Sequence, residues 1–291
     1  MNNITYFSNK RFLGMSIAVL GVVLMSFDPI FIRYSGVGGV DTVFLFGLFT
    51  AISMPIFLKF TDKRGVYRAI KESGWPLLFA SSLMLISSSS FVISVKNTTV
   101  ANTFLILATT PVFSALFSHV FLKEKLGKAA WITIGFVLLG VLIVAKGSLG
   151  SLNLLGDSMA LLSVSSLALM FVLLRKYQNV SRVAAVALAG ALLAVVMFPQ
   201  VEPSNYSSST WAVMAAMGLF SAPIGRALSM TATNYISASE VSMTLVLEAV
   251  FAMFWAYLFF KEIPSINSIT GGVVILSSIV AYTWLSLKAS D

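Results

Sequence analysis

Ten stretches of about twenty mostly apolar residues run through this 291-residue chain, and they constrain its fold more than any other feature. A helix needs about twenty apolar residues to cross roughly 30 Å of hydrocarbon. The stretches are continuously apolar, whereas the strands of a membrane β-barrel would alternate. The sequence therefore predicts an all-α integral membrane protein with ten transmembrane helices. These lie approximately at residues 12–32, 42–59, 75–95, 100–121, 129–146, 156–174, 183–199, 210–232, 238–260 and 267–287.

The composition fits lipid as the solvent and narrows the possible chemistry. Hydrophobic residues make up 58% of the chain and charged residues only 10%, against about 25% charged residues in an ordinary soluble domain. There is no cysteine and a single histidine, His119, which excludes disulfides, thiolate metal sites and sites with several histidines. We therefore expect no metal and no cofactor.

The basic residues predict an orientation in the cell (inner or plasma) membrane. If the N-terminus is inside, 14 of the 19 lysines and arginines fall at cytoplasmic helix ends. The opposite side receives four, namely Arg33, Lys96, Lys146 and Lys261. Cytoplasmic loops of membrane proteins carry such an excess of positive charge. We expect both termini to be cytoplasmic, and the net charge of +8 to reflect this asymmetry rather than binding to nucleic acid.

The two halves of the chain resemble each other. TPVFSALFSHVFLKEKL begins at Thr110 and EAVFAMFWAYLFFKEIP begins at Glu248, an offset of 138 residues that aligns Lys-Glu at 123–124 with Lys-Glu at 261–262. The first stretch ends in FIRY and the sixth in LLRKY. Chance similarity of apolar helices is the alternative, which several aligned stretches at a nearly constant offset disfavour.

Five helices per half is an odd number, so the second repeat must enter the membrane inverted. We expect one repeat over residues 12–146 and the second over 156–287. Inverted repeats related by a pseudo-two-fold axis in the membrane plane are typical of secondary transporters, with the substrate near the midplane between them.

The ten helices, the 5+5 inverted repeat and the PVF…LFLKE and LEAVF…FFKE stretches resemble the drug/metabolite transporter superfamily, and within it the EamA-type transporters. The resemblance implies alternating access and, commonly, export of amino acids or other small metabolites. Because that family also contains importers and nucleotide-sugar exchangers, substrate and direction stay open. The family has Pro-Val-Phe in both halves, whereas this chain keeps Pro111 but has Ala249 in the second. We therefore expect the ninth helix to be the straighter one.

Ionisable side chains within apolar stretches are costly and usually mark a substrate or ion path. Arg226 lies about two turns, roughly 10 Å, from the polar end of the eighth stretch. It either reaches the headgroups or a structural carboxylate, or holds a substrate carboxylate or phosphate by bidentate hydrogen bonds. Its counterpart in the first repeat is Ser88, and the resemblance implies that helices 3 and 8 line a central cavity.

Three of the carboxylates within these stretches are further candidates. Glu248 is either an internal brace or a proton carrier. Asp28 either reaches water near the outer end of the first helix, where Pro29 loosens the backbone, or binds a substrate ammonium or carries a proton. Glu240 complements the positive end of the ninth helix. We expect Arg33 at the membrane interface, paired with Asp41 or Asp28.

Uncharged residues complete the predicted site. Asn102 satisfies polar groups of a substrate or bonds one helix to another, which is the commoner use of such a residue. Trp255 is a further candidate, as are Thr103 and Asn234. The predicted substrate-binding residues are therefore Arg226, Asn102, Ser88 and Trp255, with Glu248 and Asp28 as candidates for proton coupling.

The predicted function is secondary active export of a small metabolite, with lipid, the substrate and coupling protons as partners and no nucleic acid. An importer or exchanger of another metabolite is the alternative, and a channel or a non-transport membrane protein belongs to a different class. An enzyme is not expected, since the chain lacks HExxH, a plausible Ser-His pairing and a Walker motif. The sequence leaves the oligomeric state undetermined.

Overall fold

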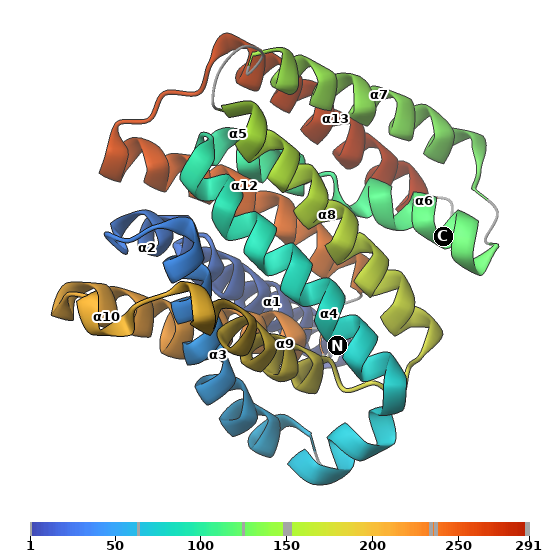
Figure 1. Cartoon of the computed structure of the whole chain (residues 1–291). Coiled ribbons are helices and arrows are strands. Elements are labelled where there is room, and N and C mark those ends of the chain that lie inside the picture. Colours follow the sequence, from blue (N-terminus) through green and yellow to red (C-terminus); the bar gives the residue numbers. More distant parts are fainter. Residues whose placement is uncertain are drawn as a thin grey trace.

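The computed structural model describes residues 2–62, 65–123, 126–147, 153–232, 235 and 238–288. Within these ranges the chain is helical and forms no strand (Figure 1). The α-helices are α1 (Asn2–Met25), α2 (Asp28–Tyr34), α3 (Gly39–Thr61), α4 (Val66–Asn97), α5 (Val100–Leu107), α6 (Thr110–Leu122), α7 (Lys128–Lys146), α8 (Asn153–Lys176), α9 (Arg182–Met197), α10 (Ser208–Ala215), α11 (Ala222–Ala232), α12 (Ala238–Phe260) and α13 (Ile266–Lys288). Three short elements join them: the 3₁₀ turns η1 (Phe198–Gln200) and η2 (Pro203–Asn205), and the π-helix η3 (Ala216–Ser221).

Among the described residues, seven helical segments are long and apolar enough to cross a membrane. They are Phe12–Tyr34, Gly39–Phe60, Tyr67–Asn97, Val100–Leu122, Lys128–Lys146, Asn153–Lys176 and Arg182–Gln200. Shorter apolar helices cover Leu247–Phe260 and Ile266–Tyr282. The predicted class, an all-helical multi-pass membrane protein, is therefore confirmed, while the number ten stays a prediction.

Three prolines coincide with breaks or kinks in the long helices, whereas Pro55 lies inside α3 without ending it. The segment of α1 and α2 breaks just before Pro29, and that of α5 and α6 just before Pro111. Inside α4, Gly74 adopts a left-handed φ of 61° two residues before Pro76. Proline lacks an N–H and clashes with the preceding turn, so an α-helix kinks or ends there. In contrast α12, with Ala249 at the aligned position, runs unbroken, which confirms that the ninth predicted helix is the straighter one.

The helices pack in pairs that are far apart in the sequence. α3 lies against α9, α4 against α8, α1 against α11, and α7 against α13 along one edge of the molecule (Figure 1). Glycines permit two of these approaches: a β-carbon on Gly47 would lie 2.5 Å from Cβ of Leu193, and one on Gly140 would lie 2.9 Å from the Gly271 carbonyl oxygen. Small residues let helix backbones approach closely in membranes, where dispersion contacts drive association.

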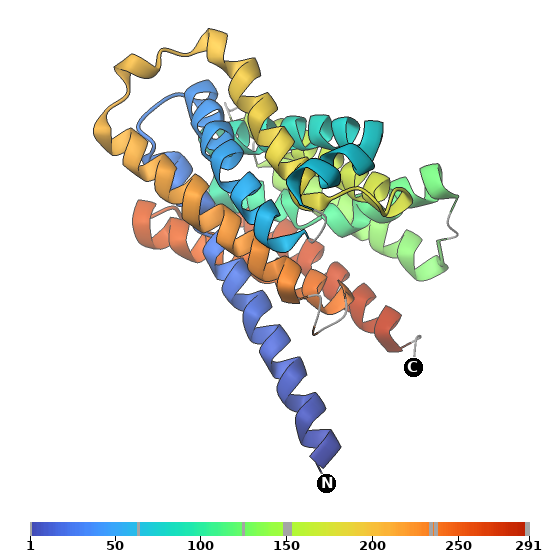
Figure 2. The ribbon, with the colours of Figure 1, turned by 90° about the horizontal axis from the view of Figure 1, so that it is seen from below.

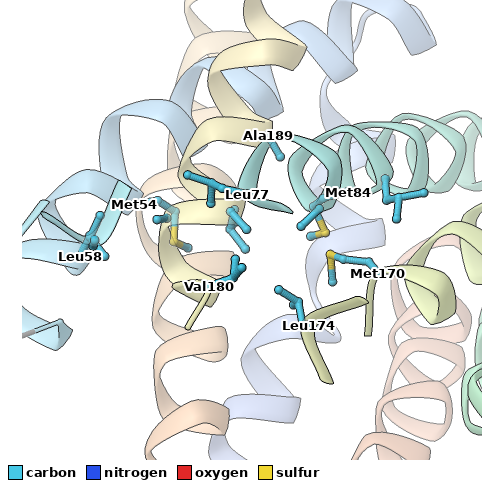
Figure 3. Close-up of a cluster of buried hydrophobic side chains, with 14 residues drawn as sticks. Met54, Leu58, Leu77, Met84, Met170, Leu174, Val180 and Ala189 are labelled. Carbon is cyan, nitrogen blue, oxygen red and sulfur yellow. The ribbon is translucent and has the colours of Figure 1, made fainter. Parts of the chain in front are cut away.

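One hydrophobic cluster joins α3, α4, α8 and α9. Figure 3 shows its side chains pointing toward one another, among them Met54, Leu58, Leu77, Met84, Met170, Leu174, Val180 and Ala189. On another side of the molecule, α1 runs beside α11 and α12, and its N-terminal part projects beyond the other helices (Figure 2). Several buried polar side chains gather where α1, α11 and α12 meet.

Candidate functional site

The break between α1 and α2 places Asp28 inside the protein. Asp28 is the first residue of α2 and is only 7% exposed, so the expectation that it reaches water at a helix end is wrong. Ser221, the last residue of η3, lies opposite. Its Oγ is 2.8 Å from the carbonyl oxygen of Leu24 and 3.1 Å from Oδ1 of Asp28. A hydroxyl has one proton to donate, so these two oxygens share it.

Arg226, on α11, faces the same region. Its Cζ lies 5.7 Å from the centroid of the Phe46 ring, and its charge attracts the carboxyl groups of Asp28 and Glu248. The Nη1 atom is buried and has no hydrogen-bond partner among the described residues. A buried donor without a partner is costly. An incoming anion would remove that cost, and the guanidinium fork matches a carboxylate or phosphate.

Glu248 and Trp255 approach this region from α12. The two residues are seven positions apart, about two helical turns, so they share a face. The carboxyl group of Glu248 interacts electrostatically with both Asp28 and Arg226. Trp255 donates from Nε1 to Oγ of Ser26 at 3.0 Å and stacks on Phe27 with ring centroids 4.4 Å apart. Trp255 therefore fastens α12 to the α1–α2 break, and its N–H is already used.

Asn102 lies in a separate polar network between α5, α8 and α13. Its Nδ2 is 3.2 Å from each carboxylate oxygen of Asp157, and its Oδ1 accepts from Oγ of Ser268 at 2.5 Å. Thr98 also donates to Asp157, at 2.7 Å. These contacts support the alternative in which Asn102 bonds helix to helix. Sequence reasoning missed Asp157, which is 2% exposed; its position just inside the stretch 156–174 was the available signal.

The remaining candidates are Ser88, Asn234 and Glu240. Ser88 is buried on α4, where the neighbouring Ser87 lies 3.2 Å, Oγ to Oγ, from Ser163 of α8. Among the described residues no hydrogen bond joins Ser88 to Arg226. Asn234 and the side chain of Glu240 lie outside the described residues. The structure thus brings together Asp28, Arg226, Glu248 and Trp255 and places Asn102 in the Asp157 network, while the part of Ser88 in the site stays a prediction.

Arg33 is held at the junction of several helices. Its Nη1 lies 2.8 Å from Oε2 of Glu262, and its Nη2 donates to the Thr98 carbonyl oxygen at 2.8 Å. The Glu262 contact is ionic, because Oε2 forms no aligned hydrogen bond among the described residues. The other oxygen of Glu262 accepts the first N–H of α5, that of Val100, at 2.6 Å, a favourable place for a negative charge.

The predicted partners of Arg33 are therefore wrong. After the break, α2 turns Arg33 toward the α4–α5 junction and away from Asp28. Asp41 accepts instead from the hydroxyl of Tyr206 at 2.8 Å. Burial, followed by this hydrogen bond and the charge of Asp41, raises the pKa of Tyr206 above its ordinary value, so the hydroxyl stays a donor.

Comparison with known proteins identifies the class of this helical bundle. The sequence model of the EamA-like transporter family matches residues 12–146 and again residues 154–284. The chain belongs to the EamA-like transporter family. The predicted resemblance to the drug/metabolite transporter superfamily is thereby confirmed.

Curated members of the family are similar over much of the chain. The uncharacterized transporter YdfC of Bacillus subtilis is 29% identical over 191 residues, which cover 63% of this chain and 62% of YdfC. The chain therefore matches about three fifths of the length of that relative. The pseudopaline exporter CntI of Pseudomonas aeruginosa is 24% identical over 227 residues, 73% of this chain and 76% of CntI.

A solved crystal structure has the same fold. It superposes with a TM-score of 0.64 over 94% of this chain and 98% of that one, at 18% identity. At this level of identity the likeness concerns the architecture alone. The EamA-like fold thus accounts for the helix arrangement, while the chemistry has to be argued from the side chains.

Proposed function

We propose that this EamA-like transporter is a secondary active transporter that exports a small metabolite carrying a carboxylate, by alternating access. Arg226 holds the anionic group, and Asp28 and Glu248 line the same site as carriers of a coupling proton. The observation that carries the proposal is the buried Nη1 of Arg226, unpartnered among the described residues, beside two carboxyl groups. A site with an arginine donor to spare is suited to an anion that arrives and leaves.

The proposed architecture is ten transmembrane helices in two inverted repeats. Helix contacts support it, because a contact within one set of predicted spans recurs between the equivalent spans of the other repeat. The third and sixth spans meet as α4 and α8, and their equivalents, the eighth and first, meet as α11 and α1. The contact of α6 with α8 recurs in the same way as that of α12 with α1. The lysines of the two Lys-Glu motifs support it as well. Lys123 and Lys261 both adopt the left-handed conformation, with φ of 57° and 55°, which is uncommon outside glycine.

We further propose an inner-membrane location with both termini in the cytoplasm, from the distribution of basic residues. The name of CntI supports export, since that relative is called a pseudopaline exporter. Import or exchange of another metabolite would use the same site and differ in direction. A channel would need no site that binds and releases its solute, so saturable counterflow separates a transporter from a channel.

The decisive experiment measures uptake by the purified protein in proteoliposomes, using radiolabelled amino acids, lactate and succinate as probes. Arg226→Ala should reduce uptake of the transported probe at least about 100-fold, because it removes an interaction of roughly 3 kcal/mol or more with a buried charge. The control is Arg182→Ala, an exposed arginine at the start of α9, which should transport like the parent. Uptake by Arg226→Ala equal to that of the parent would refute the site.

Proton coupling has its own test. A pH gradient imposed across the liposomes should accelerate uptake by the parent severalfold. In Asp28→Asn or Glu248→Gln, whichever carries the proton, that acceleration should disappear, because an amide cannot bind and release a proton. If both variants respond to the gradient as the parent does, neither carboxyl group is the proton carrier.

A further inference from the structure

The π-helix η3 lies one turn before Arg226 and interrupts an otherwise α-helical segment, Ser208–Ala232. In this π turn the N–H of Ala222 donates a hydrogen bond to the carbonyl oxygen of Met217, five residues earlier. A single π turn adds one residue to an α-helix, and such insertions occur often at functional sites. The extra residue rotates the C-terminal part of the segment by about 100° relative to an uninterrupted helix.

Contacts with α3 hold η3 in place. Ser53 of α3 donates to the carbonyl oxygen of Gly218, at 2.8 Å, so a polar group within the π turn finds its partner in another helix. Gly218 itself lies against Phe49, because a β-carbon there would overlap the β-carbon of that residue. Both contacts form only when the helix turns Gly218 toward α3.

The register after η3 decides which residues face α1. Gly225 lies four residues after Ser221, on the same face. A β-carbon on Gly225 would lie 2.6 Å from Cγ of Met25 and 2.8 Å from the Gly21 carbonyl oxygen. No side chain fits in that position. With Gly225 turned toward α1, the next residue, Arg226, points about 100° away, toward Phe46 and the carboxyl groups.

We propose that η3 positions the site: it presents the Ser221 hydroxyl to Asp28, and its register aims Arg226. Ser221 is thus a positioning residue for the carboxyl group of Asp28, and Trp255 fixes the same α1–α2 break from the opposite side through Ser26. This inference rests on the proposed function, in which Asp28 and Arg226 line the substrate site.

Ser221→Ala tests the hydroxyl. It removes the donor to Asp28, the proposed proton carrier, so the apparent KM for protons, measured as uptake of the transported probe against external pH, should change about tenfold, the usual worth of a hydrogen bond to a charged group, with the maximal rate within twofold of the parent. Ser221→Thr keeps the donor and should restore most of the affinity. The control is Ser82→Ala, an exposed serine that bonds its own helix. A normal KM in Ser221→Ala, or no rescue by threonine, would overturn the role of Ser221.

Insertion tests the register. An alanine inserted after Ser221 moves Ile224 into the place of Gly225, where no side chain fits, so it should lower the thermal midpoint and abolish transport. Combining the insertion with Ile224→Gly returns a glycine to that place and should restore the midpoint but not transport, because Arg226 stays rotated by about 100°. Transport restored by Ile224→Gly would mean that the register set by η3 does not aim Arg226.

The two proposals can fail separately. The thermal midpoints of the insertion variants are measured without any substrate, so they report the register even if Arg226→Ala transports like the parent. Conversely, loss of uptake in Arg226→Ala together with a normal KM for Ser221→Ala would leave the proposed function intact and remove only the positioning role. Thermal unfolding of each variant in detergent checks that it is folded.

Discussion

Two arginines that lie inside the helical bundle, Arg33 and Arg226, differ in how many protein partners their guanidinium groups have. Arg33 contacts the carboxylate of Glu262 and the carbonyl oxygens of Val95 and Thr98, and its Cζ lies 5.4 Å from the ring centroid of Phe260. Arg226 contacts a ring and has a buried Nη1 with no hydrogen-bond partner among the described residues. Arg33 is thus bonded within the fold, whereas Arg226 is the arginine that we propose for a ligand.

The backbone explains the difference. Arg33 lies beside the end of α4, where the last carbonyl groups of a helix have no intrahelical partner and accept hydrogen bonds from side chains. Arg226 instead lies on α11 beyond η3 and faces the Phe46 ring and the carboxyl groups of Asp28 and Glu248. Its Nη1 meets no acceptor among the described residues.

The sharpest test of this comparison is the stability of Arg33→Ala. Removing Arg33 leaves Glu262 as a partly buried carboxylate without its counter-charge, which typically costs about 3 kcal/mol. Thermal unfolding in detergent should show a clearly lowered midpoint. Arg226→Ala is the matched comparison and should lower the midpoint less, because removing the buried Nη1, which has no hydrogen-bond partner among the described residues, offsets part of the lost attraction to Asp28 and Glu248. If the two variants are equally destabilised, the distinction between a structural and a ligand-binding arginine is wrong.

A smaller effect is expected for Glu262→Gln. The amide oxygen of glutamine can still accept from the N–H of Val100, while the attraction to Arg33 and the favourable charge at the start of α5 are lost. The expected loss of stability is about 1 kcal/mol, from the interaction of a carboxylate with a helix N-terminus. The control is Glu202→Gln, which removes a carboxylate whose hydrogen bond to Asn205 is exposed. A loss as large as that of Arg33→Ala would show that Glu262, not Arg33, organises the junction.

Much of the fold follows from local features of the sequence. Continuous apolar stretches predict membrane helices because lipid leaves a backbone no partner outside its own helix. Pro29 and Pro111 mark helix breaks because proline removes a backbone donor, and Ala249 leaves α12 unbroken. The PVF…LFLKE and LEAVF…FFKE stretches were enough to indicate the EamA-type family, which the match over both halves confirms.

The candidate site was predictable only in part. Ionisable residues in apolar stretches singled out Arg226, Glu248 and Asp28, and the structure brings their charges together. Ser88 was chosen by repeat symmetry, and its part in the site stays a prediction. Ser221 gave no signal, because a serine in a membrane helix is common and only its partner across the fold makes it notable.

The sequence by itself thus determined that this chain is a helical membrane protein, that its first and fourth stretches break at Pro29 and Pro111, and which family it belongs to, since these depend on hydrophobicity and backbone chemistry along the chain. Tertiary structure decided which polar groups meet. Trp255 bonds Ser26 across 229 positions and Ser221 reaches Asp28 across 193. Such pairs depend on the rotation of each helix about its axis, which one extra residue in η3 changes by about 100°.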